Sequence, residues 1–84
     1  MVSRDTQVVK AELLATFRRA GARAGAVLPP KWLQRHYLPS FTPEERAVFE
    51  DAVHELIADG LVEFVQRGSA NLRLTPKGAA HIGA

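Results

Sequence analysis

The stretch from Thr42 to Gly60 constrains the fold more than any other part of the chain, because it carries signals for both ends of a helix. Thr42, Pro43 and Glu45 match a capping box with proline at the first helical position. Gly60 stands at the expected helix end, and glycine adopts the left-handed conformation of a helix end more readily than any other residue type. Between these signals an apolar stripe at helical spacing predicts one buried face: Phe49, Ala52, Val53, Leu56 and Ile57.

The residues after this helix predict an antiparallel hairpin. Residues 61–66 and 71–75 alternate and are rich in β-branched or aliphatic side chains. The connection, residues 67–70, contains a glycine that can supply a positive φ. Thr75 and Pro76 are typical of the start of a short last helix, although two glycines weaken that segment.

The first half of the chain predicts a helix and a very short strand. Asp5 or Thr6 can cap the helix, and Gly21 is well placed to end it. Residues 26–28 can form only a very short strand, since a proline follows them. The predicted buried stripe of the helix is Val9, Leu13, Phe17 and Ala20.

A second helix is predicted from Pro29 or Pro30, either of which suits a first helical position, and it should stop before Pro39. Its inward residues are Trp32, Leu33 and Tyr37. The aromatic side chains of the chain occupy core-like positions, and we interpret them as packing residues: Trp32, Tyr37, Phe41, Phe49 and Phe64.

Composition bounds the class of protein. The 84 residues suffice for one domain, residues 1–84. The absence of cysteine suits a reducing cytoplasm, and no apolar run approaches the roughly 20 residues of a membrane span. The net charge is +2, but residues 1–40 carry seven cations and two anions, whereas residues 41–84 carry four cations and seven anions. This asymmetry either marks a partner-binding face or only solvates the two halves.

Two motifs resemble those of bacterial and archaeal winged-helix regulators. Asp59-Gly60-Leu61-Val62-Glu63 ends the predicted helix, and Leu74-Thr75-Pro76-Lys77-Gly78 follows the hairpin. The resemblance covers about residues 8–82. It implies an α+β winged helix-turn-helix domain with three helices and a small two- to three-stranded antiparallel sheet, whose hairpin is the wing. Some winged-helix domains bind DNA, and others bind proteins.

The DNA-binding members of this family place the third helix in the major groove. The resemblance makes Glu44, Ala47, Asp51 and His54 the groove-facing positions and residues 67–73 the wing. However, residues 42–59 carry one cation and six anions, which duplex DNA repels. We therefore expect a transcription regulator or DNA-associated accessory factor that contacts the phosphate backbone through five cations: Lys31, Arg35, Arg67, Arg73 and Lys77.

A different class of function remains open. The acidic third helix can instead dock a basic protein partner, and the residues proposed for this role are Glu44, Asp51, His54 and Glu55. A metal ion held by Asp51, His54 and Glu55 is the weaker interpretation of the same face, which a solvated acidic surface explains better.

No pattern indicates an enzyme or a cofactor, because no nucleophile with a base or phosphate-binding loop is visible. Winged-helix regulators are commonly two-fold dimers, so we expect a weak homodimer. The surfaces available for it are the first helix and residues 79–82.

Overall fold

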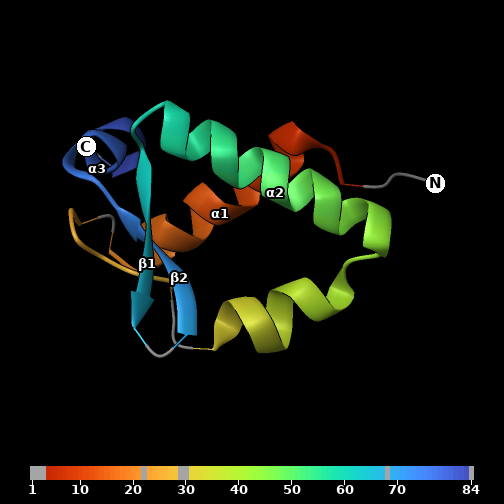
Figure 1. Ribbon diagram of the computed structural model, residues 1–84. Helices are drawn as coiled ribbons and strands as arrows, with labels where there is room; N and C mark the ends of the chain where they lie inside the picture. The colour runs from red at the N-terminus through yellow and green to blue at the C-terminus, as the bar shows by residue number, and fades with distance from the viewer. Residues whose placement is uncertain (1–3, 22, 29–30, 68, 84) are drawn as a thin grey trace.

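The structure, a computed structural model, describes residues 4–21, 23–28, 31–67 and 69–83. It has an α+β architecture in which α2 packs on α1 and the hairpin stands at one end of both helices (Figure 1). The η1 and η2 segment runs below α2, from beside the hairpin to the start of α2 (Figure 1). The elements are α1 (Thr6–Arg19), η1 (Leu33–Tyr37), η2 (Leu38–Ser40), α2 (Pro43–Ala58), β1 (Val62–Arg67), β2 (Ser69–Leu74) and α3 (Pro76–Gly83).

The described residues contain four helical segments and not the three that were predicted. The fourth is α3, the short last helix that Thr75 and Pro76 indicated but that the predicted three-helix architecture did not count. It forms despite its two glycines because Thr75 caps it: the Gly78 N–H donates to the Thr75 hydroxyl at 2.9 Å. The other three are α1, the continuous run of η1 and η2, and α2.

The prediction for α2 is confirmed at both ends. The Thr42 hydroxyl accepts from the Glu45 N–H at 3.2 Å, and the Glu45 carboxylate accepts from the Thr42 N–H at 2.9 Å. Gly60 takes a φ of +77° after the last turn. Of the predicted stripe, Ile57 is an error, since 38% of it is exposed. It lies at the rim of the groove described below.

In α1, Asp5 is the cap, and its side chain accepts from the Val8 N–H at 2.9 Å. Gly21 follows the helix end with a φ of +115°, as predicted. Ala20 was assigned to the buried stripe and is instead the exposed C-cap residue. The buried residues of α1 are Val9, Leu13, Thr16 and Phe17.

The second helical segment differs from its prediction. It starts as a π-helix and passes into a 3-10 turn that includes Pro39, so it does not stop before that proline. Pro39 is tolerated because it falls in the first turn of η2, where no N–H is required. The π turn brings residues five apart over one another, and the rings of Trp32 and Tyr37 stack with centroids 4.7 Å apart.

The strands β1 and β2 form an antiparallel hairpin, with Val62 opposite Leu74 and Phe64 opposite Leu72. The prediction placed the strands at residues 61–66 and 71–75, whereas β1 starts and ends one residue later and β2 starts two residues earlier and ends one residue earlier. The connection between the strands is therefore shorter than the predicted residues 67–70. The predicted strand at residues 26–28 is reduced to one isolated bridge between Val27 and Arg73.

The core gathers residues from every helix and strand except η2 and is built mainly from aliphatic side chains, with three aromatic ones, Phe17, Tyr37 and Phe41. Phe64 is a correction to the sequence prediction, because it was assigned to the core and 57% of it is exposed. Strand alternation places it on the same face as buried Val62, but beyond the point where the core ends.

Candidate docking site

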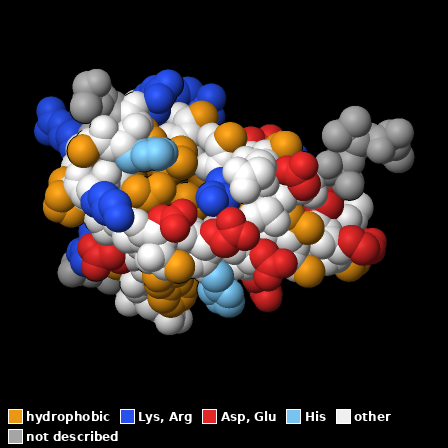
Figure 2. Space-filling model, turned by 90° about the horizontal axis from the view of Figure 1, so that it is seen from above, with side chains coloured by type: hydrophobic (Ala, Val, Ile, Leu, Met, Phe, Trp, Pro, Cys, Tyr) orange, Lys and Arg blue, Asp and Glu red, His pale blue; other side chains and the backbone are white. Residues whose placement is uncertain are grey.

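The outer face of α2 carries acidic side chains that the protein itself does not neutralise. Glu44, Glu50 and Asp51 are exposed, and no ion pair to any of them occurs within the described part of the chain. Figure 2 shows acidic side chains in a band over this side of the molecule, with hydrophobic side chains beside it. Arg46 is the one cation of α2, so the exposed side of this helix keeps a net negative charge. Net charge of one sign on an exposed face favours binding of the opposite charge.

Other acids are already paired. The Lys10 ammonium lies 3.1 Å from the Glu55 carboxylate and 3.8 Å from that of Asp59. Glu63 pairs with Arg73 at 3.3 Å. Glu55, one of the predicted docking residues, therefore faces α1 and is partly neutralised, while Glu44, Asp51 and His54 are exposed.

Arg4 organises a network that the sequence did not reveal. Its guanidinium contacts Glu12 at 3.2 Å and Glu45 at 3.7 Å, and it lies 4.4 Å from the centre of the Phe41 ring. Its backbone N–H also donates to the Glu45 carboxylate at 3.1 Å. The pKa of Glu45 is lowered, first by the hydrogen bond from the Thr42 N–H and then by that from Arg4.

Tyr37 closes the same network from η1. Its hydroxyl donates to the Glu12 carboxylate at 2.5 Å. Burial raises the pKa of Tyr37, and the hydrogen bond to Glu12 and its negative charge raise it further. These contacts join the start of α1, η1 and the start of α2, so this cluster serves the fold.

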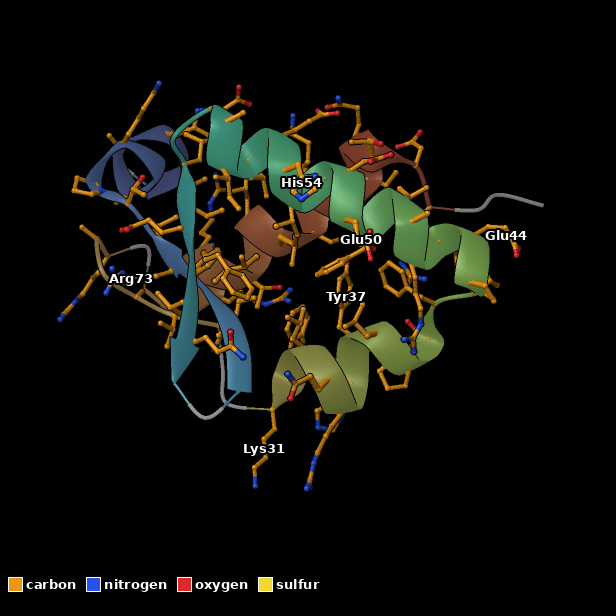
Figure 3. The ribbon with its side chains drawn as sticks, in the orientation of Figure 1. Lys31, Tyr37, Glu44, Glu50, His54 and Arg73 are labelled. Carbon is orange, nitrogen blue, oxygen red and sulfur yellow. The ribbon has the colours of Figure 1, made fainter. Side chains whose placement is uncertain are left out.

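Of the five predicted DNA-contacting cations, the four whose side chains the structure describes do not form one patch. Lys31 and Arg35 are exposed beside η1, and Lys77 is exposed on α3. Arg73 is half-buried in β2 and paired with Glu63, and the side chain of Arg67 lies outside the described residues. Figure 3 shows Lys31 and Arg73 projecting from different sides of the molecule.

An apolar groove that the sequence did not reveal lies between α2, the hairpin and the η1–η2 segment. It consists of two adjoining hollows of about 150 and 370 Å³ that share Phe49, Val53 and Phe64. Leu33, Leu38 and Leu72 line the first hollow, whereas Glu50, His54 and Ile57 line the second. In Figure 3, Glu50 and His54 lie along the same stretch of α2, and Glu44 lies at its far N-terminal end. The apolar stripe of α2 alone did not indicate the groove, because the sequence does not show that the Phe64 side chain stays largely exposed beside it.

Two other kinds of site would point to a different function, a metal site and a membrane-spanning helix. Among the residues that the structure describes, no three His, Asp or Glu side chains come together as a metal site requires, so Asp51, His54 and Glu55 do not form one. Over the same residues no helix is long and apolar enough to cross a membrane.

Comparisons with protein-family models, curated proteins and solved structures found no match to this chain.

Proposed function

We propose that this chain is a protein-interaction module of winged-helix type, which docks a basic protein partner on α2. The order of helices and hairpin, together with the two motifs that resemble winged-helix regulators, supports the assignment of type. The observation that carries the proposed function is the group of exposed, unpaired acids on α2: Glu44, Glu50 and Asp51.

The charge of α2 argues against its use as a DNA recognition helix. Duplex DNA carries one negative charge per about 1.7 Å of its axis, so every unpaired acid brought into the major groove of the DNA adds repulsion. A basic protein surface gains from the same acids, mainly as faster association at low salt.

Duplex DNA is a second candidate because of Lys31 and Arg35. Both are exposed and have no acidic partner within the described residues. The Arg35 N–H donates to the Lys31 carbonyl at 2.8 Å, so the two residues lie one helical turn apart on the outer side of η1. In this case η1 and the hairpin would hold the phosphate backbone and α2 would face away.

One salt series separates the two candidates. The probes are a Lys-rich peptide of about 18 residues and a duplex of about 20 base pairs, each titrated at several salt concentrations. We expect the peptide to bind and to lose affinity with salt, and Glu44→Gln with Asp51→Asn to weaken it about two- to fivefold. The matched control is Lys31→Gln with Arg35→Gln, which should leave peptide binding unchanged.

The opposite pattern would replace the proposal by the DNA candidate. The DNA candidate predicts that the protein binds the duplex and that the logarithm of the binding constant falls linearly with the logarithm of the salt concentration. It also predicts that Lys31→Gln with Arg35→Gln weakens this binding. Arg67→Ala with Arg73→Ala would then flatten the salt slope by about 0.9 for each phosphate that the two side chains no longer neutralise.

A further inference from the structure

We propose that the apolar groove between α2 and the hairpin binds the apolar face of a short amphipathic helix whose flanks carry Lys or Arg. This inference rests on the proposed function and gives it a binding site and a partner chemistry. The groove is defined by the two adjoining hollows that meet at Phe49, Val53 and Phe64.

The exposure of the Phe64 ring on the side of the hairpin that faces α2 is the strongest indication of a partner. It points to the same side of the hairpin as Val62, and Leu72, its partner across the strands, is only 2% exposed. The ring therefore faces α2 and not the outer side of the hairpin, yet 57% of it remains in contact with solvent. An aromatic side chain of this exposure at a groove gains about 25 cal/mol for each Å² that a partner covers.

The shape of the groove suits a helix. It follows α2 from Phe49 to Ile57, which is about 12 Å at about 1.5 Å per residue. This length matches apolar anchors at positions i, i+4 and i+7 of a bound helix, the pattern by which helices occupy grooves. The first hollow, of about 150 Å³, is open to solvent and lined mainly by apolar side chains, three of them leucines, and it takes one aliphatic anchor.

The charges beside the groove select a basic partner. Glu50 lines the second hollow and Asp51 is its exposed neighbour on α2, and neither is paired within the described chain. Lys or Arg residues beside the anchors of a bound helix would reach these carboxylates. A second copy of this chain fits less well, because a two-fold contact centred on the groove would bring the acids of one α2 against those of the other.

The probe that tests this inference is a pair of Lys-rich peptides of about 18 residues with identical composition. One places Leu at i, i+4 and i+7 on one helix face with Lys on both sides. The other has the same residues in an order without an apolar face. We expect the amphipathic peptide to bind at least about tenfold more tightly than the scrambled one, and to shift the NMR resonances of Phe49, Val53 and Phe64.

Substitutions then locate the site. Phe64→Ala and Ile57→Ala should each weaken the amphipathic peptide about fivefold or more and leave the scrambled one unchanged. Val8→Ala is the matched control, since Val8 is 38% exposed like Ile57 but lies on α1. Glu50→Gln should weaken both peptides, whereas Asp59→Asn, which removes the same charge from the side facing Lys10, should not. Thermal melts establish that each variant is folded.

Each outcome has a distinct meaning. Equal binding of the two peptides, sensitive to salt and to Glu50→Gln, overturns the groove inference and leaves the proposed function standing. Binding of neither peptide overturns both. Self-association that Phe64→Ala abolishes overturns the choice of occupant, because a second copy then fills the groove.

Discussion

Gly78 has a position that no other residue can fill without disturbing the fold. A Cβ built there would overlap the Leu61 carbonyl and would lie 2.7 Å from a Leu74 methyl carbon. Thr75, three residues earlier, caps α3 and also donates its hydroxyl toward the carbonyls of Gly60 and Leu61. The Thr75-Pro76-Lys77-Gly78 motif is thus a packing device that seats α3 on the turn between α2 and β1.

Gly78→Ala is expected to destabilise the protein by about 2–3 kcal/mol, because the new methyl group overpacks a backbone contact. Helix propensity alone predicts the opposite sign, a gain of about 1 kcal/mol. Urea unfolding monitored by circular dichroism measures the change, with Ala80→Gly, at an exposed position of the same helix, as the measure of propensity. A more stable Gly78→Ala protein would refute the close approach.

Glu45 makes the free energy of unfolding depend on pH in the acid range. Its folded-state pKa is lowered, so its contribution is complete above the unfolded pKa of about 4.3 and is lost as the pH falls through the folded pKa. We expect Glu45→Gln to lower the melting temperature at about pH 7, and the difference from the parent to shrink as the pH falls below about 4. Glu44→Gln, which removes a charge from the same turn without these hydrogen bonds, is the control. A constant difference between parent and Glu45→Gln over this pH range would contradict this account.

At the scale of elements, α2 and the hairpin were predictable and the η1–η2 segment was not. The signals of α2 are local, since the caps and Gly60 lie at its own ends. The π turn depends on residues far away in the sequence, because Tyr37 donates a hydrogen bond to Glu12 and the Arg4 guanidinium lies over its ring. Alternation assigned Phe64 to the correct face of its strand, but it carries no information on how far the core extends.

Tyr37 offers a direct test of this segment, because it is the only tyrosine of the 84 residues. Near-ultraviolet absorbance of tyrosinate should titrate well above the ordinary pKa of about 10, and Glu12→Gln should lower the midpoint. Since the folded pKa is raised, the neutral phenol stabilises the fold fully below about pH 10 and progressively less as the pH rises. The denatured protein, which should titrate near 10, is the control. A folded-state midpoint near 10 would mean that Tyr37 is not held against Glu12.

For the whole molecule, the asymmetry of charge along the sequence is only partly an asymmetry in space. Lys10 from the basic half neutralises Glu55 and Asp59, and Arg4 neutralises Glu45. Among the described residues, the acids without an ion pair include Glu44, Glu50 and Asp51 of α2, and the cations without one are spread over several elements: Arg18, Arg19, Arg23, Lys31, Arg35, Arg46 and Lys77. Sequence charge counts could predict the sign of the α2 face but not the groove beside it, because the groove depends on how α2, the hairpin and η1 meet.

The homodimer stays a prediction, and the surface proposed for it from the sequence, α1 with residues 79–82, contains two hollows. Ala11, Leu14 and His81 line two shallow hollows between α1 and α3. Ala15→Glu, placed at the first of these, should shift a weak dimer to monomer by bringing like charges and bulk into a small-residue contact. Sedimentation across a range of concentrations measures this, with Phe64→Ala, in the groove, as the control. A monomer at every concentration would exclude the dimer.

The three hydrogen bonds of Thr75 have a consequence for how the molecule opens. They fasten the base of the hairpin to the start of α3 and to the end of α2 at one hydroxyl, and Arg18 fastens the end of α3 to α1 through the Ile82 carbonyl at 3.0 Å. The hairpin and α3 therefore cannot detach one after the other, and their amide protons should exchange with solvent at a common free energy.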